Sequence, residues 1–451
     1  MPTLALSMIV KNAAQDLPGC LASVKGIVNE IVIADTGSTD SSREIARQAG
    51  AKVFSIPWNN DFAEARNLSL AQVSADWVLM LDADEHLDPG ASSVLPSLLS
   101  GVDVSAYQVP IRNYLLSLEK KVWDRPARPN DSDYAPARPY PAYVEHENVR
   151  LFRRDPAVFF TGRVHETVGY RVRETGKKLG AATFCIHHFG MVVDDSVMAR
   201  KLLFYRDLGR LKLKENPNDA QAHLEVGIVE LENLGNVAQA LQDFERACSL
   251  NPRFGVAWFF AAKSHFRLGR FPDALRSLKR AESAGHGTAA VAQLAGDAHY
   301  NLGDYHAAHA SYTLALQRDP SSPAISSKLG LAEVRVGKPG TGLARIRRAI
   351  ESHPSNPEFH DRLIVVQVWL DHLPDAAEAA ERKLAALPPR PEDFLRAASI
   401  RGQMKDWQRA SGLLRLGLVI FPESESLRST LSAIETSLHP LSASFASPIK
   451  Q

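Results

Sequence analysis

The first 82 residues alternate between short apolar runs and amphipathic segments. Strands are expected at residues 4–10, 30–35, 51–56 and 77–82. Helices with good capping residues are expected between them, at 14–26, 38–50 and 61–73. Such an alternation predicts an α/β domain with a mostly parallel sheet and helices on both faces. Ligands of these sheets bind beyond the carboxyl ends of the strands, where Asp35 and Asp82 are expected.

Beyond residue 104 the alternation becomes irregular. Strand-like segments are expected at residues 104–114, 149–154, 157–168 and 181–191. Residues 123–148 are rich in Pro, Arg, Asp and Tyr, a composition that disfavours any regular element. Long loops inside compact domains usually serve a function, so we interpret this segment as a flap beside a binding site.

The second half of the chain changes to helical periodicity with an internal repeat. Pro320, Pro354, Pro388 and Pro422 follow one another at intervals of 34 residues, and Pro252 precedes them by two intervals. A small residue recurs at one fixed position of each repeat: Ala240, Ala274, Ala308, Gly342, Ala376 and Ala410. This pattern resembles six tetratricopeptide repeats over residues 221–422, followed by a capping helix.

Most of these repeats carry a glycine where the first helix ends, at Gly235, Gly269, Gly303 and Gly337. Asp371 and Lys405 replace it in the fifth and sixth repeats, so the turns there are expected to differ. The two patterns together divide the chain into four parts. We expect a first domain over 1–194, a linker helix over 195–217, the repeats with their cap over 218–437, and a disordered tail over 438–451.

Composition excludes some classes of partner. A formal net charge of +1 gives no basis for binding nucleic acid or a membrane surface. No transmembrane segment of about 18 apolar residues and no signal peptide is recognisable, so we expect a cytoplasmic protein. Cys20, Cys185 and Cys248 lack paired spacing, which argues against a disulfide framework or a zinc site and fits a reducing cytosol.

A cluster of carboxylates follows the apolar strand at 77–82. Asp82 and Asp84 share one face if the strand continues, so both can address one ligand. Paired carboxylates suit Mg²⁺ or Mn²⁺, which also bind phosphate oxygens. The alternative is an acidic turn before a helix. That alternative explains Asp88, which with Pro89 forms a typical helix start, but it leaves the first two carboxylates unexplained.

Two further segments add candidate ligand-binding residues. Asp35 ends a strand, where its carboxylate could accept hydrogen bonds from a nucleotide base or ribose. Arg66 and Asn67 begin a helix that leads into the acidic strand, and the arginine could bind a phosphate or pair with an acidic residue. A plain surface arginine is the alternative.

The segments "MIVKN", "EIVIADTGSTD", "EARNLSL" and "WVLMLDADE", in this order, resemble family 2 glycosyltransferases with the GT-A fold. The resemblance extends to about residue 190 through "VRLFRR", "GRVHE" and "HHFG". It implies a Rossmann-like catalytic domain that uses a nucleotide sugar and a divalent metal. It implies that Asp35 contacts uracil, Asp82 the ribose side of the donor, and Asp84 the metal.

The same resemblance suggests further roles for residues near the end of this domain. His188 corresponds to a histidine that binds the metal in many GT-A enzymes, with His187 and a packing role as competitors. Glu166 is the candidate general base of an inverting transfer, with Glu147 and Glu85 as rivals. The segment 123–148 would then be a flap on the acceptor side.

A transferase domain followed by repeats resembles sublancin-type peptide S-glycosyltransferases, and the catalytic part also resembles glucosyltransferases of lipopolysaccharide core assembly. We therefore expect transfer of a hexose, most simply glucose, from a UDP-sugar to a peptide or protein held by the repeats. The alternatives are a saccharide acceptor and a non-catalytic repeat scaffold. A homodimer is also compatible with the sequence. The expected groove residues are Phe259, Phe266, Arg267, Tyr300 and Asn301.

Overall fold

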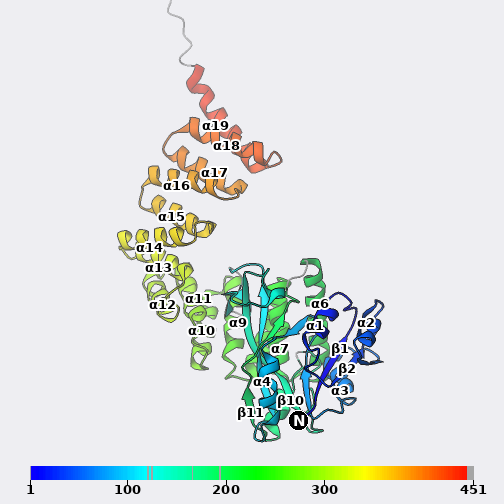
Figure 1. Ribbon diagram of the computed structural model, residues 1–451. Coiled ribbons are helices and arrows are strands. Elements are labelled where there is room, and N and C mark those ends of the chain that lie inside the picture. Colours follow the sequence, from blue (N-terminus) through cyan, green and yellow to red (C-terminus); the bar gives the residue numbers. More distant parts are fainter. Residues whose placement is uncertain (1, 119–120, 123–124, 165, 192–194, 444–451) are drawn as a thin grey trace, which may run out of the picture. The chain divides into compact units, whose positions relative to one another are not determined.

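The computed structural model describes residues 2–118, 121–122, 125–164, 166–191 and 195–443. The chain divides into two compact units, Met1–Gly235 and Asn236–Gln451. Figure 1 shows the labelled strands in the first unit, and the described part of the second unit is helical. The division falls inside the first expected repeat. Helix α6 (Asp195–Glu215), expected as a linker, packs against α7 (Ala220–Ile228) and η2 (Val229–Asn233) in the first unit.

A mixed sheet forms the centre of the first unit. Its main strands lie in the order β3-β2-β1-β4-β10-β6-β12-β5. They are β3 (Lys52–Ser55), β2 (Glu30–Asp35), β1 (Leu4–Val10), β4 (Trp77–Met80), β10 (Ala142–Arg153), β6 (Ala106–Leu115), β12 (Ile186–His188) and β5 (Glu85–Leu87). Two short strands extend it, β9 (Arg128–Pro129) beside β10 and β11 (Leu179–Ala181) beside β6. A separate small sheet pairs β7 (Lys121–Val122) with β8 (Arg125–Pro126).

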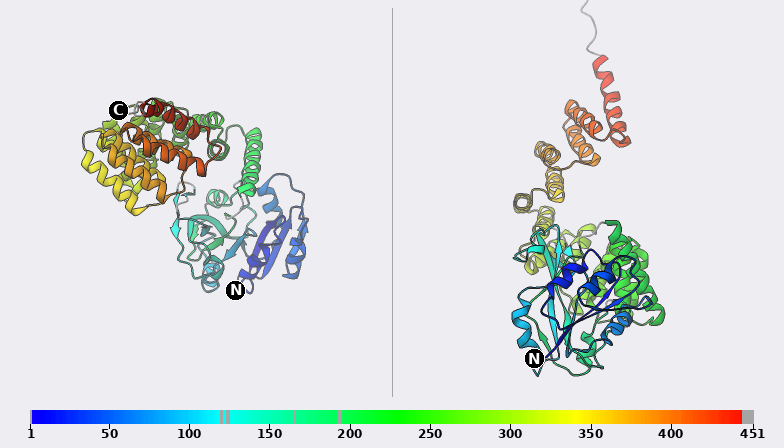
Figure 2. Two further views of the ribbon diagram at one scale, coloured as in Figure 1. Left: turned by 90° about the horizontal axis from the view of Figure 1, so that it is seen from above. Right: turned by 45° about the vertical axis from the view of Figure 1, so that its right-hand side comes forward.

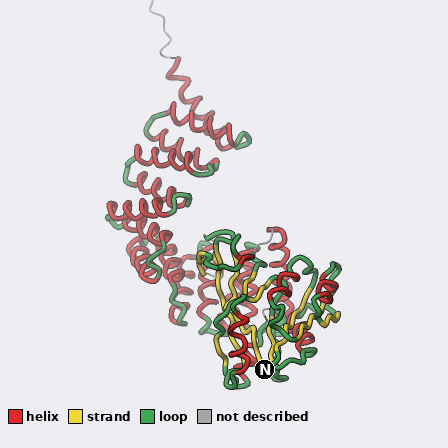
Figure 3. The backbone as a smooth tube through the Cα atoms, viewed as in Figure 1, coloured by secondary structure: helices red, strands yellow, loops and turns green. Residues whose placement is uncertain are grey.

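The strands that the alternation predicted form the parallel part of this sheet. Strands β1, β2, β3 and β4 pair in parallel, whereas β10 runs antiparallel to both β4 and β6. Apolar side chains at alternate strand positions point to opposite faces of the sheet and pack into two separate cores. One core includes residues of α1 (Leu17–Ser23), α2 (Ser42–Gln48) and α4 (Ala91–Ser100), and the other includes residues of α3 (Phe62–Leu70) and α5 (Gly169–Glu174). Helices therefore cover both faces of the sheet, as expected (Figure 3).

Two segments of the first unit differ from the expectation. Residues 142–148, expected to be irregular, form the first half of β10 because they pair with β6 from Ala142↔Leu115 onwards. In the described part of the segment before them, the short strands β8 and β9 and the short helix η1 (Ala135–Ala137) are the regular elements. Residues 157–168 were expected as a strand, but their described part (157–164 and 166–168) contributes only an isolated bridge between Thr161 and Thr167. Whether each segment forms a strand depends on pairing with a neighbouring strand, and the local composition does not reveal that pairing.

The second unit is a stack of helices in which each packs against the next (Figure 2). The helices are α8 (Val237–Leu250), α9 (Gly255–Arg267), α10 (Phe271–Ser283), α11 (Ala289–Asn301), α12 (Tyr305–Arg318), α13 (Pro323–Arg335), α14 (Pro339–Ser352), α15 (Pro357–Trp369), α16 (Leu373–Ala386), α17 (Pro391–Gln403), α18 (Trp407–Ile420) and α19 (Glu425–Ala443). Two helices per 34 residues is the arrangement of tetratricopeptide repeats. The expected superhelical class is confirmed.

The recurring small residues lie where neighbouring helices meet. All five alanines of the set are fully buried, and Gly342 is buried as well. A Cβ atom added at Gly342 would lie 2.4 Å from the carbonyl oxygen of Gly330, so only glycine allows these helices to approach so closely. The small position of each repeat is therefore required by packing.

The turns of the fifth and sixth repeats do not differ from the others, contrary to the expectation. The four glycines have positive φ angles, for example 79° at Gly303, and Asp371 and Lys405 adopt nearly the same angle at 58° and 61°. Each therefore bears the steric cost of a left-handed backbone with a side chain present. The helix α19 also continues to Ala443, so residues 438–443 of the expected tail are helical. Residues 444–451 lie outside the described residues.

Candidate active site

The acidic loop between β4 and β5 is balanced by two arginines. The Asp82 Oδ1 atom accepts a hydrogen bond from Arg66 Nη2 at 2.8 Å, and Oδ2 lies 3.5 Å from Arg150 Nη2. Burial favours the neutral acid, but both guanidinium groups outweigh it and hold the pKa of Asp82 well below its ordinary value. The carboxylate is therefore ionised and oriented at the carboxyl end of β4.

Glu85 holds this loop in shape. The residue is 2% exposed, and its two carboxylate oxygens accept from the Asp82 backbone N–H at 2.8 Å and from Arg150 Nη2 at 2.7 Å. The Glu85 N–H in turn donates to the carbonyl of Asp82 at 3.0 Å. With both oxygens engaged, this rival for the base acts by positioning Asp82. The other rival, Glu147, is exposed on β10.

Asp84 faces His188 across the pairing of β5 with β12. The antiparallel register sets His188 opposite Glu85, which brings the imidazole Nε2 to 3.4 Å from Asp84 Oδ2. The other ring nitrogen, Nδ1, lies 2.7 Å from Asn113 Oδ1. Because the amide oxygen can only accept, Nδ1 carries the proton in this assignment, and Nε2 is left to face the carboxylate. Although burial opposes charging, the Asp84 carboxylate, as a hydrogen-bond acceptor and a negative charge, raises the pKa of His188.

His187 points to the other face of the sheet, because neighbouring strand residues alternate. Its Nδ1 lies 2.7 Å from the Tyr114 hydroxyl, and its Nε2 lies 3.1 Å from Asp88 Oδ2. The helix cap expected at Asp88 is therefore wrong: α4 begins at Ala91 with Gly90 as the capping residue. Asp88 Oδ1 accepts from the Gly90 N–H at 2.8 Å in the preceding turn, and Oδ2 belongs to the histidine contact.

Arg66 connects Asp82 with Glu166. Its Nε donates to Glu166 Oε1 at 2.5 Å, and both side chains are largely buried. Its Nη1 is buried and has no hydrogen-bond partner among the described residues. The ring of Tyr205 on α6 lies near the same group, where burial and then the carboxylates of Asp82, Glu166 and Asp84 raise its pKa to about 12. The structure thus gathers these carboxylates into one site.

Asp35 ends β2 and is fully buried. Its carboxylate accepts from the backbone N–H groups of Gly37 at 3.2 Å and Ser38 at 3.1 Å, and Arg43 Nε lies 3.9 Å away. It therefore shapes the turn that follows the strand, at the same edge of the sheet as the acidic loop. Contact with a base remains a prediction for this residue.

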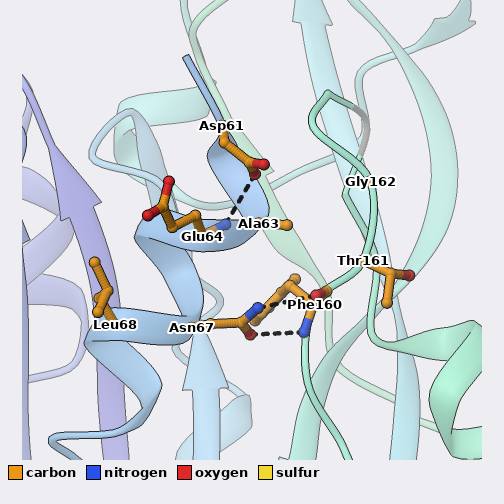
Figure 4. Close-up of a pocket in the computed structure, with 8 residues that line it drawn as sticks. All are labelled: Asp61, Ala63, Glu64, Asn67, Leu68, Phe160, Thr161 and Gly162. Atoms are coloured by element: carbon orange, nitrogen blue, oxygen red, sulfur yellow. Dashed lines mark hydrogen bonds between the residues drawn. The ribbon is translucent and has the colours of Figure 1, made fainter. Parts of the chain in front are cut away.

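Asn67 bonds to a neighbouring loop, and its expected contact with the sugar donor remains a prediction. Its side-chain amide donates to the Phe160 carbonyl at 2.9 Å and accepts from the Phe160 N–H at 2.8 Å (Figure 4). These bonds tie α3 to the loop that leads to Glu166. The residues drawn in Figure 4 line a hollow of about 580 Å³, and neither Asp82 nor Asp84 is among them. Asn67 is thus placed to position that loop, and the hollow is separate from the acidic loop.

Comparison with known proteins assigns this site to a family. The Glycosyl transferase family 2 profile matches residues 6–159, and the Tetratricopeptide repeat profile matches 230–290, 261–323 and 293–357. The lipopolysaccharide core biosynthesis glycosyltransferase LpsC of Rhizobium meliloti is 30% identical over 208 residues, which cover 44% of this chain and 68% of LpsC. The chain belongs to glycosyl transferase family 2.

Other relatives of this family 2 glycosyltransferase match shorter segments. The SPbeta prophage-derived glycosyltransferase SunS of Bacillus subtilis is 24% identical over 37% of this chain and 34% of SunS. A TPR repeat-containing protein of Synechococcus elongatus is 45% identical over 24% of this chain and 27% of its own length. The chain thus spans about a quarter to a third of the length of these two relatives. Within the described residues, no helix is long and apolar enough to cross a membrane.

The expected groove residues of this glycosyltransferase differ in exposure. Phe259 is only 4% exposed and packs against Phe260 and His286, so its expected place on an open surface is wrong. Phe266 and Tyr300 are half-buried and contact aromatic neighbours on the following helices. Arg267 and Asn301 are exposed. A partner role for the residues other than Phe259 remains a prediction.

Sequence reasoning missed three residues of the family 2 site. Arg150 lies within the quoted "VRLFRR" segment, but its partner Glu85 is 65 positions away. Asn113 contacts His188 across 75 positions, and Tyr205 stands on the helix expected to be only a linker. Other polar residues on the same strands, such as Arg112 on β6 and Glu147 on β10, left no clear signal in the sequence for the first two.

Proposed function

We propose that this family 2 glycosyltransferase moves a hexose, most simply glucose, from a UDP-sugar to a peptide or protein acceptor in the cytoplasm. The observation that carries the proposal is the pairing of Asp84 with His188, beside an Asp82 carboxylate held ionised by two arginines. Carboxylate and imidazole at one strand end, next to buried cations, suit a metal-bound diphosphate.

The donor set fits a divalent metal. Asp84 Oδ2 and His188 Nε2 converge, and Asn113 orients the imidazole from behind as partners of metal-binding histidines commonly do. A Cβ atom at Gly190 would lie 1.9 Å from Asp84 Oδ2, so glycine is needed beside this carboxylate. When bound, Mg²⁺ or Mn²⁺ would offset the negative charge of the diphosphate.

The chain's own side chains would divide the remaining work. Asp35 and Asp82 would bind the uracil and ribose side of the donor. Arg66, whose Nη1 lacks a partner among the described residues, would donate to the donor and orient Glu166. Glu166 would take the proton from the acceptor hydroxyl or thiol as the sugar is transferred with inversion.

The repeats support a protein acceptor or partner. Arrays of this class bind extended peptides or helices on their surfaces, which would hold an acceptor next to the transferase. A saccharide acceptor is the second candidate, because LpsC is a lipopolysaccharide core biosynthesis glycosyltransferase by name. In that case the repeats would recruit other proteins. A homodimer remains an open alternative for their role.

The test is a panel of nucleotide sugars incubated with the full chain, with and without Mn²⁺, followed by detection of released UDP. We expect Mn²⁺-dependent turnover of a UDP-hexose that Asp84→Asn abolishes, while the repeats keep their thermal stability. Labelled sugar appearing on peptides instead of glycolipids favours the protein acceptor. If calorimetry detects no binding of UDP or UDP-sugars in the presence of Mn²⁺, the scaffold alternative replaces the enzyme.

A further inference from the structure

Asp88, Cys185 and His187 converge on the face of the β5–β12 pair opposite to His188. The Nε2 atom of His187 lies 3.1 Å from Asp88 Oδ2 and 3.9 Å from Cys185 Sγ. The sulfur and the carboxylate oxygen are 4.0 Å apart. Three different metal-binding atoms thus form a small triangle, outside the site proposed for the donor metal.

The backbone explains why they meet. Cys185 and His187 are two positions apart across the start of β12, so their side chains share a face. Asp88 follows β5, and its N–H donates to the Cys185 carbonyl at 3.2 Å. The pairing Ile186↔Leu87 lies between these residues and fixes their register. The triangle is therefore produced by the sheet itself.

We propose that these three side chains bind a zinc ion. Thiolate, imidazole and carboxylate together suit Zn²⁺, whereas Mg²⁺ and Mn²⁺ favour oxygen ligands. Tetrahedral zinc with bonds of about 2.0–2.3 Å places its ligand atoms roughly 3.3–3.7 Å apart. The distances of 3.1, 3.9 and 4.0 Å bracket that range, so small side-chain rotations close the site.

The surroundings of His187 are those of a metal-binding histidine. Its ring is fully buried and stacks on Tyr134 with 4.5 Å between ring centroids. Its second nitrogen, Nδ1, is engaged by the Tyr114 hydroxyl at 2.7 Å. An outer hydrogen bond of this kind fixes the ring and aims the other nitrogen at the metal. The Asp88 side chain is 29% exposed, so water can reach the cluster and would supply the fourth ligand.

Sequence spacing argued against a zinc site because the three cysteines lack paired spacing. That argument does not reach ligands that the sheet brings together. Cys185 and His187 are close in sequence, but Asp88 follows a strand almost a hundred residues earlier, and the pairing of β5 with β12 unites them. The inference does not depend on the proposed transferase activity.

The experiment uses the full chain, stripped with a chelator and titrated with Co²⁺ in place of Zn²⁺. A cobalt–thiolate bond gives a charge-transfer absorption in the near ultraviolet that oxygen and nitrogen ligands do not give. We expect this band to appear at one equivalent of Co²⁺, to vanish when Zn²⁺ is added, and to persist in excess Mg²⁺. Direct metal analysis of the stripped chain reloaded with zinc is expected to find one tightly held ion.

Variants assign the ligands. Cys185→Ser is expected to abolish the band, and Cys248→Ser, which removes a buried cysteine of the second unit, is expected to leave it unchanged. If Cys185→Ser does not fold, Asp88→Asn provides the test instead. This variant changes a partly exposed position and is expected to weaken Zn²⁺ binding at least tenfold. Asp84→Asn is expected to keep the band, which separates this site from the donor metal.

Two results would overturn the inference. The first is a wild-type chain that shows no cobalt–thiolate band and retains no zinc, in which case the three residues form only a hydrogen-bonded cluster. The second is a band that survives Cys185→Ser, which would place the thiolate elsewhere. Both readouts are independent of sugar transfer, so failure of the proposed function leaves them interpretable.

Discussion

Replacing Arg150 with methionine tests whether the acidic loop depends on a buried ion pair. The substitution keeps much of the apolar stem but removes the charge that pairs with Glu85 within the described part of the chain. In that pair, Arg150 Nη2 lies 2.7 Å from Glu85 Oε1. The two side chains are 12% and 3% exposed, so water cannot replace the lost partner. An uncompensated buried charge costs about 3–5 kcal/mol of the free energy of unfolding. We expect about 3 kcal/mol, because the Asp82 N–H still donates to Glu85.

A surface pair of the same length provides the control. Arg415 Nη2 and Glu435 Oε1 are also 2.7 Å apart, but their side chains are 65% and 44% exposed. Arg415→Met is expected to cost less than about 1 kcal/mol, because solvent screens the pair. The double variant Arg150→Met with Glu85→Gln is expected to recover most of the loss, since glutamine is neutral and keeps an acceptor for the Asp82 N–H.

Hydrogen exchange followed by mass spectrometry measures the effect in each unit of the chain separately. Peptides from β4 and β10 report on the first unit, and peptides from α9 to α18 serve as an internal reference that Arg150→Met is expected to leave unchanged. The reasoning is refuted if Arg150→Met costs no more than Arg415→Met. It is also refuted if the double variant is as unstable as the single one.

Three further predictions concern the turns and the metal site. Lys405→Gly is expected to stabilise the repeats by about 0.5 kcal/mol, because φ is 61° there and glycine adopts that angle without steric cost. Gly303→Ala, at a φ of 79°, is expected to destabilise them by about 1 kcal/mol. Urea unfolding measures both changes in the free energy of unfolding, and changes of the same sign would contradict the argument. Asn113→Ala is expected to weaken Mn²⁺ binding by about 10–100-fold in calorimetry, with circular dichroism as the folding control. Because the pKa of His188 is raised, a proton competes with the metal for its imidazole. The affinity for Mn²⁺ is therefore expected to fall as the pH drops from about 8 to about 5.5. In His188→Asn the affinity is expected to fall less steeply over the same range.

The sequence predicted local elements well where one pattern dominated. Apolar alternation located β1 and β2 to the residue, and the 34-residue period located the helix pairs with their buried small residues. It failed at 142–148, where polar residues from Glu145 to Asn148, joined to the Pro- and Tyr-rich residues before them, disguise a strand whose partner is β6. The αL turns at Asp371 and Lys405 were also missed, because glycine is preferred in that conformation but is not obligatory.

The sequence predicted which residue types form the candidate site, but it did not predict most of the contacts between them. Asp82 and Asp84 could be recognised from their place after a buried strand. Arg66 could be named from the sequence as a candidate partner of an acidic residue, and it does pair with Asp82. Arg150 could not, because it reaches Asp82 from 68 positions away. A sequence pattern has no information on such distances until the strand order is known. The choice between His187 and His188 likewise required the register of β12.

That register has a mechanical consequence for the protein. Strand β12 has only three residues, and it is held on one face by His188 with Asn113 and Asp84, and on the other by His187 with Tyr114 and Asp88. A slip by one residue would exchange the two histidines between faces and break both sets of contacts at once. Both faces therefore depend on the same register, so a substitution that weakens the contacts on one face also weakens those on the other. Engineering of either face will have to preserve the alignment of both.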